Sequence, residues 1–168
     1  MRVSHPVALF VFTCNLNSSY DGDTLPHTRL QNPNTGGYSF GRVPDAKSRD
    51  VVFPGGHIYL PTGKHIGPNK GFGACHIWAE HKKEMLVAKF DAEDLVPHYV
   101  ATIIQGGTPL LFEGQYAKAL RLIAVRGVSG MAILELRERP EEIFWSVITA
   151  YSANKKHGVR IGTVLDVV

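Results

Sequence analysis

The sequence has few cysteines, no long apolar segment and little net charge. Its only cysteines are Cys14 and Cys75 and it has no CxxC pair, so neither a disulfide framework nor a zinc ribbon is predicted. The longest apolar run near its start, residues 7–12, is far shorter than the ~20 residues that span a bilayer. Walker A, GxGxxG and HExxH motifs are absent too. We therefore expect no metal, no cofactor and no membrane partner.

The composition indicates one folded domain with an unusual number of histidines. A length of 168 residues fits a single domain. Hydrophobic residues make up 44% and charged residues 20%, which excludes a mainly disordered chain. The net charge of +3 is too small to indicate a nucleic-acid partner by itself. The 8 histidines stand out because histidine changes its charge near neutral pH.

The pattern of apolar residues predicts an α+β fold, with N-terminal helices packed on a small antiparallel sheet. Residues 1–50 are predicted to be an irregular leader or arm with one strand at 7–13, and residues 51–168 the folded domain. Helical spacing covers 74–89, and a second helix ends at the glycines 106–107. Between 62 and 73 we expect a loop. Apolar runs predict strands at 119–125, 131–137, 143–151 and an edge strand at 161–168.

Three histidines, His65, His76 and His81, fall in a basic stretch rich in glycine. Residues 64–83 hold four lysines against one acid, Glu80. Glycines let a phosphate group approach the backbone closely, and cations offset its charge. On one helix, residues five apart lie ~140° from each other, so His76 and His81 do not suggest a metal pair. Alternatively, His81 is a core histidine and His76 a surface cap.

A second group of polar residues lies in the last third of the chain. Thr149 and Tyr151 are two apart on a predicted strand and therefore share a face. That face could instead serve packing, together with Val147. Arg121 lies between two leucines of a predicted strand. If its side chain points inward, it needs a carboxylate or a phosphate as partner. Alternatively, it lies on a solvent-exposed face of the strand. Arg160 follows in a basic tail.

These residue types suit acid–base chemistry on RNA without a metal. One group removes the proton of the 2′-hydroxyl, and another protonates the leaving 5′-oxygen. Cations and hydroxyl donors stabilise the charge that builds on the phosphate. The product would carry a 2′,3′-cyclic phosphate.

The stretch HIYLPTGKHIGPNKGFGACHIWAEH at 57–81, with the later VITAY at 147–151, resembles the BECR ribonuclease superfamily (barnase, EndoU, colicin and RelE-like nucleases). It is most similar to the polymorphic-toxin and phage-associated branches, whose pattern is roughly GFG-x-x-HI-x-x-x-H followed by a strand with Thr-x-Tyr. The resemblance covers about residues 51–168 and implies a BECR-like fold.

The same resemblance implies a toxin that cuts tRNA or other RNA in the cytoplasm after secretion or delivery, and that a cognate immunity protein or antitoxin blocks. By position, His76 and His81 would be the acid–base pair. Thr149 and Tyr151 would bind phosphate or donate a proton. Substrate-binding candidates are His65, Lys83, Arg121 and Arg160.

Two other classes of function remain open at this point. The cationic pocket would also suit another phosphodiester- or nucleotide-processing enzyme, although the Arg…Ser-x-Ser…Glu-x-Glu series of ADP-ribosylating enzymes is not convincing here. A non-catalytic RNA- or partner-binding domain would use its histidines only for structure. The catalytic hypothesis requires that residues 64–83 and 149–151 face one cleft.

Overall fold

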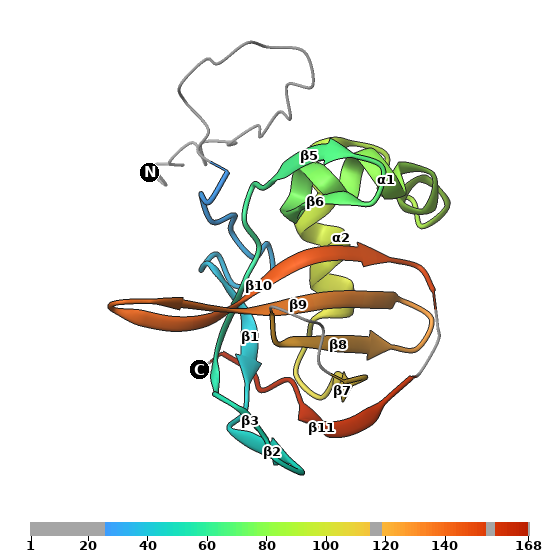
Figure 1. Ribbon diagram of the computed structural model, residues 1–168. Helices are drawn as coiled ribbons and strands as arrows, with labels where there is room; N and C mark the ends of the chain where they lie inside the picture. The colour runs from blue at the N-terminus through green and yellow to red at the C-terminus, as the bar shows by residue number, and fades with distance from the viewer. Residues whose placement is uncertain (1–25, 115–118, 154–156, 168) are drawn as a thin grey trace, which may run out of the picture.

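The computed structural model describes residues 26–114, 119–153 and 157–167. Seven strands form one sheet in the order β1-β4-β10-β9-β8-β7-β11 (Figure 1). They are Ser39–Val43 (β1), Gly56–Tyr59 (β4), Glu142–Tyr151 (β10), Gly130–Arg139 (β9), Arg121–Arg126 (β8), Pro109–Phe112 (β7) and Val159–Thr163 (β11). The predicted antiparallel series is confirmed in β8, β9 and β10, and β11 is an edge strand.

Strand β4 joins the first part of the chain to the last. It runs parallel to β10, with Ile58 opposite Trp145 and Tyr59 opposite Ser146. Strand β1 then pairs antiparallel with β4 and forms the other edge of the sheet. The whole sheet curls into a half-barrel.

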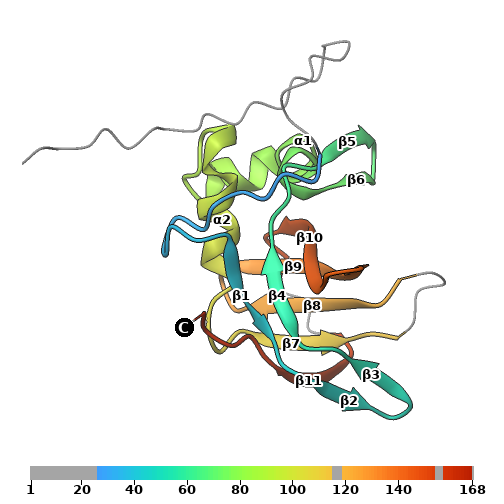
Figure 2. The ribbon, with the colours of Figure 1, turned by 90° about the vertical axis from the view of Figure 1, so that its left-hand side faces the viewer.

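Two short hairpins and two helices complete the described structure. The hairpins pair Ala46–Ser48 (β2) with Val51–Phe53 (β3), and Lys64–Gly67 (β5) with Lys70–Phe72 (β6). The helices are Gly73–Val87 (α1) and Val96–Ile103 (α2), with a 3₁₀ turn at Glu93–Leu95 (η1) between them. Figures 1 and 2 together show that α2 lies behind the sheet. In both views α1, β5 and β6 lie next to β10.

The two faces of the sheet bury different sets of side chains. Leu122, Leu134 and Val147 join α2 in the main core. We call the opposite side, away from α2, the outer face. A smaller buried cluster lies there, formed by Leu111, Ile123, Val125 and Met131. The alternation along β8 follows the two-residue period of a strand.

The predicted fold class is wrong. The protein is 45% strand and 19% helix, and its two short helices follow β1 to β6 instead of opening the domain. Residues 39–48, predicted to be irregular, form β1 and β2, and the predicted loop at 62–73 contains β5 and β6. Strands of three to five residues show too few alternations to be detected. The strand predicted at 7–13 lies outside the described residues.

Candidate active site

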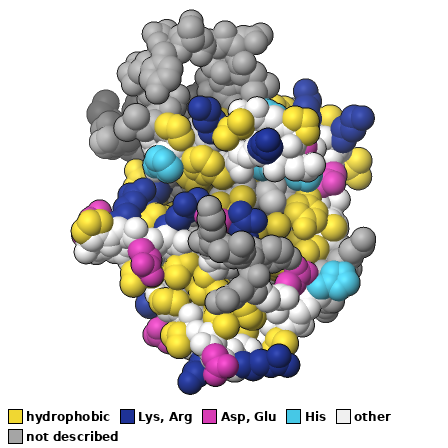
Figure 3. Space-filling view, viewed as in Figure 1, with side chains coloured by type: hydrophobic (Ala, Val, Ile, Leu, Met, Phe, Trp, Pro, Cys, Tyr) yellow, Lys and Arg dark blue, Asp and Glu magenta, His cyan; other side chains and the backbone are white. Residues whose placement is uncertain are grey.

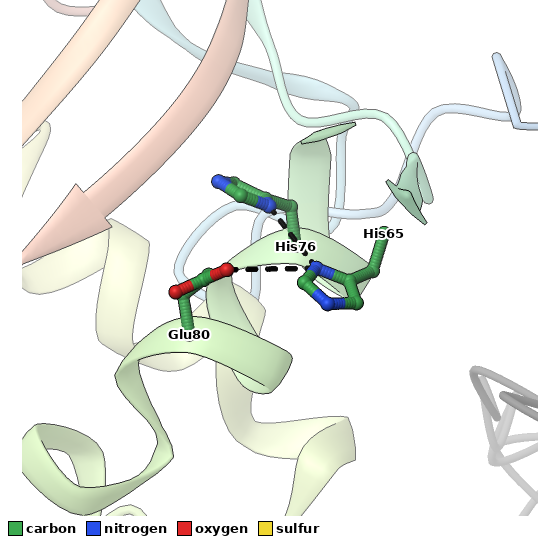
Figure 4. A group of neighbouring side chains, drawn as sticks. All are labelled: His65, His76 and Glu80. Carbon is green, nitrogen blue, oxygen red and sulfur yellow. Dashed lines mark hydrogen bonds and ion pairs between the residues drawn. The ribbon is translucent and has the colours of Figure 1, made fainter. Parts of the chain in front are cut away.

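Three side chains from the β5–β6 hairpin and α1 form what we call the histidine cluster: His65, His76 and Glu80 (Figure 4). The Nδ1 atoms of His65 and His76 are 3.4 Å apart, and the two rings are stacked with centroids at 5.6 Å. Oε1 of Glu80 lies 3.9 Å from Nδ1 of His65. His76 and Glu80 are four residues apart on α1, which places them on one side of the helix.

The hairpin turn brings His65 to the helix. Gly71 has φ 142°, and a Cβ there would collide with the carbonyl oxygen of Lys64 and lie 2.8 Å from Nδ1 of His76. Only glycine leaves room for this approach. The backbone N–H of Asn69 donates a hydrogen bond of 3.0 Å to Oε1 of Glu80, which ties the hairpin to α1 a second time.

Burial gives His76 the properties of a neutral base. Its side chain lies in the first turn of α1 and is only 6% exposed. Burial lowers the pKa of the imidazole, Glu80 opposes this, and the neighbouring His65 and His81 lower the pKa further. The Nε2 end of the ring points away from His65 (Figure 4). A neutral ring with that nitrogen free can accept a proton.

His81 connects the same helix to β10. Its backbone leaves the helical conformation at φ −120° and ψ 17°, so α1 is kinked there. The ring stacks on Tyr151 at a centroid distance of 5.3 Å, and its Nδ1 lies 3.5 Å from Oε2 of Glu84. The same Glu84 oxygen accepts a 2.8 Å hydrogen bond from the backbone N–H of Ser152. The kinked half of α1 therefore rests against the end of β10.

Thr149 and Tyr151 lie together on the outer face of the sheet. The pairing of β10 with β9 is irregular between Val147 and Thr149, and the alternation shifts there. Val147 consequently belongs to the main core, whereas Tyr151 packs against the outer cluster. The alternative in which Val147 shares a face with Thr149 and Tyr151 is therefore wrong. The buried Thr149 hydroxyl has no hydrogen-bond partner among the described residues.

A buried carboxylate on the outer face holds two arginines. Glu135 is 6% exposed, accepts a 2.8 Å hydrogen bond from Nε of Arg121 and forms a 2.8 Å ion pair with the guanidinium of Arg137. In the ladder, Glu135 lies between Arg121 on β8 and Ser146 on β10. The carboxylate partner expected for an arginine in this strand is thus present.

Next to this group is a pocket of about 350 Å³. Arg29, Arg137 and Arg139 line it, together with the aromatic rings of Tyr59, Phe72 and Phe144. Figure 3 shows Lys and Arg side chains gathered across the middle of this face. Ser146 also lines the pocket, so β10 leads directly from the pocket to Thr149.

The structure brings together most, but not all, of the predicted residues. His65, His76 and His81 lie near one another on the hairpin and α1, and His81 meets Tyr151. Lys83 is exposed on α1 and joins none of these contacts among the described residues. Arg160 is exposed on β11, which β7, β8 and β9 separate from β10. Arg160 therefore lies away from the histidines.

Several residues of the site were not predicted. Glu80 follows His76 by four residues, and Glu84 follows His81 by three. Side chains at these spacings are neighbours on a helix, so both contacts could have been predicted from the sequence. Glu135 interrupts an apolar run, which is a weaker signal. For Arg29 no signal existed, because its place beside β10 depends on long-range folding.

Among the described residues, no helix is long and apolar enough to cross a membrane. No protein-family model matches the sequence, and no curated protein or solved structure is significantly similar to it.

Proposed function

We propose that this protein is an endoribonuclease that cleaves RNA, with tRNA among the candidate substrates, by attack of the 2′-hydroxyl and without a metal. One observation carries the proposal: the ring of His81 lies on Tyr151. This contact joins the helix with the acid–base candidates to the strand with the hydroxyl groups. The support comes from the motif residues and their contacts, and it does not depend on the predicted fold class.

The two histidines have surroundings that suit different steps. His76, whose pKa is lowered by burial, takes the proton of the 2′-hydroxyl as the O2′–P bond forms. His81, held by Glu84 and Tyr151, gives a proton to the 5′-oxygen as the P–O5′ bond breaks. The products are a 2′,3′-cyclic phosphate and a free 5′-hydroxyl. The return of one proton from His76 to solvent and the uptake of one by His81 restore the enzyme.

The outer face supplies the groups that would bind the substrate. The Thr149 hydroxyl is buried and has no hydrogen-bond partner among the described residues, so a phosphate oxygen that reached it would meet an unpaired donor. Arg137 and Arg139 of β9 line the pocket beside the aromatic rings, next to the first half of β10. Cations and aromatic rings in one pocket suit single-stranded RNA, because cations pair with phosphates and bases stack on rings.

The test is cleavage of a labelled RNA by the full chain in EDTA, with the ends of the products identified. We expect cleavage with 2′,3′-cyclic phosphate ends, and none where the attacking nucleotide is 2′-deoxy. His76→Ala and His81→Ala should each lower the rate at least about 100-fold. The matched control is His98→Ala, an exposed histidine on α2 that should keep the parent rate.

Other outcomes identify other functions. Intact RNA that binds with the same affinity to parent and His81→Ala would overturn the proposal in favour of a binding domain. Cleavage that EDTA abolishes would overturn it in favour of a metal-dependent phosphodiesterase.

We also propose that this activity makes the protein a toxin with an immunity protein or antitoxin as partner. The support is the same set of histidines and hydroxyl groups, since uncontrolled RNA cleavage stops growth. Induced expression should arrest growth, and His81→Ala should relieve the arrest. Co-expression of a neighbouring small open reading frame should also relieve it. Normal growth on expression of a folded, RNA-cleaving chain would contradict the toxin role.

A further inference from the structure

The histidine cluster has the donor atoms and the spacing of a transition-metal site. One ligand atom each of His65, His76 and Glu80 lies within 4.8 Å of the others. The Nδ1–Nδ1 distance is 3.4 Å and the His65–Glu80 distance is 3.9 Å. In tetrahedral zinc with bonds of about 2.0–2.1 Å, ligand atoms lie about 3.3–3.4 Å apart. Small side-chain rotations would therefore close the site around an ion.

The donor set selects the kind of metal. Two imidazole nitrogens and one carboxylate suit zinc, whereas calcium and magnesium prefer oxygen ligands. The cluster is partly buried, with His65 and Glu80 having side-chain exposures of 21% and 23%. An ion could thus enter from solvent and keep a water as its fourth ligand.

The surroundings hold these ligands in place before any ion binds. The Asn69 N–H donates to Oε1 of Glu80 and orients the carboxylate. The missing side chain of Gly71 leaves Nδ1 of His76 open toward His65. Outer hydrogen bonds of this kind fix ligand orientation in metal sites.

We propose that His65, His76 and Glu80 bind one Zn²⁺, and that zinc in this place switches off the chemistry of His76. The second part rests on the proposed function, and the first part does not. Without metal, an Nδ1–H donated to His65 leaves Nε2 of His76 free to accept a proton. Zinc on Nδ1 places the ring proton on Nε2, and the ring can then no longer act as a base.

Binding is tested first, without RNA. The metal-free full chain is titrated with Zn²⁺ by calorimetry and with Co²⁺ by visible absorption. We expect one ion per chain and the absorption of tetrahedral Co²⁺. Glu80→Gln and His65→Ala should weaken binding at least tenfold, and His98→Ala should bind as the parent does. No binding by the parent, or equal binding by Glu80→Gln and His65→Ala, would overturn the site.

A measurement on the parent keeps the test valid if a variant fails to fold. Zn²⁺ should shift or broaden the ring ¹⁵N resonances of His65 and His76 while those of His98 stay unchanged. Unchanged resonances of His65 and His76 at saturating zinc would also overturn the site.

RNA cleavage is the second arm. Zinc should inhibit the parent, and EDTA should restore the rate. Zinc binding without any RNA cleavage would leave the site intact and remove the proposed function. Cleavage that continues at full rate with zinc bound at these residues would overturn the switch alone.

Discussion

At the scale of single residues, the Thr149 hydroxyl is a buried group to which the proposed function would give a partner. It is buried on β10 and has no hydrogen-bond partner among the described residues. An unpaired buried hydroxyl lowers stability by roughly 1–3 kcal/mol. A substrate oxygen as its partner would explain why the group is there.

Thr149→Val separates the effect of the hydroxyl on catalysis from its effect on stability, because valine lacks the hydroxyl but keeps the branched shape. We expect the cleavage rate to fall at least tenfold through loss of a donor to the phosphate. The free energy of unfolding should not fall, because no hydrogen bond is lost. Initial rates and urea unfolding measure the two quantities.

The matched control is Thr108→Val. The Thr108 hydroxyl donates a 2.8 Å hydrogen bond to the carbonyl oxygen of Ile103 and is fully buried. This variant should lose roughly 1–3 kcal/mol of stability and keep its catalytic rate. A Thr149→Val variant with the parent rate would show that the hydroxyl plays no part in catalysis.

The periodicity of the sequence predicted the secondary structure around some of these residues, but it did not predict the contacts among them. The helical spacing over 74–89 correctly predicted the helix that carries His76 and His81. The helical spacing gave no sign of the kink at His81, where the ring contacts Tyr151 and Glu84. The pairing of His65 with His76 likewise depends on a hairpin whose strands are too short to predict.

At the scale of elements, Glu84 joins α1 to β10. Its Oε2 accepts the Ser152 N–H and lies 3.5 Å from Nδ1 of His81. Glu84→Ala removes the acceptor, so the Ser152 amide should exchange with deuterium several times faster. The loss of global stability should stay near 1 kcal/mol, because the bond is exposed.

Glu84→Gln is the control for this experiment. The amide side chain keeps an oxygen for Ser152 and removes the charge beside His81. Its Ser152 exchange should stay close to that of the parent. Equal exchange in parent and Glu84→Ala would show that Glu84 does not hold the two elements together.

The elements predicted correctly are those with long, regular apolar patterns. The helix over 74–89 and the strands over 131–137 and 143–151 are present as α1, β9 and β10. Strand β4 has four residues, and its partner β10 lies more than eighty residues later in the sequence. No local pattern indicates such a pairing, and this is why the size of the sheet was underestimated.

At the scale of the whole molecule, Arg29 fastens the segment before β1 to the start of β10. Its guanidinium lies 2.6 Å from Oε2 of Glu142 and 3.6 Å above the ring of Tyr59. The hydrogen bond from Arg29 lowers the pKa of the Glu142 carboxyl, burial opposes it, and the charges of Arg29 and Arg139 lower it further.

This depressed pKa predicts acid-sensitive stability. The folded state holds the proton on Glu142 less tightly than the unfolded state, whose carboxyl titrates near its ordinary 4.5. The contribution to stability is therefore present above that pH and is lost as pH falls through the lower folded value. Urea unfolding should show Glu142→Gln less stable than the parent at neutral pH, with the difference shrinking below about pH 4.5.

Glu141→Gln serves as the control, because its exposed carboxylate neighbours Glu142 in the sequence. It should match the parent at every pH. A Glu142→Gln deficit that does not change with pH would mean that the ion pair does not cause it.

The parallel pairing of β4 with β10 also determines when the site can exist. Residues 56–59 reach their central neighbour only after residues 142–151 have been made, and parallel pairings between distant segments form slowly. The hairpin and α1 follow β4 along the chain, but His81 finds Tyr151 only at the end of β10. A nascent chain on the ribosome therefore carries His65, His76 and His81 while it still lacks the strand that His81 contacts. Translation of β10 therefore sets the earliest moment at which the proposed activity could begin.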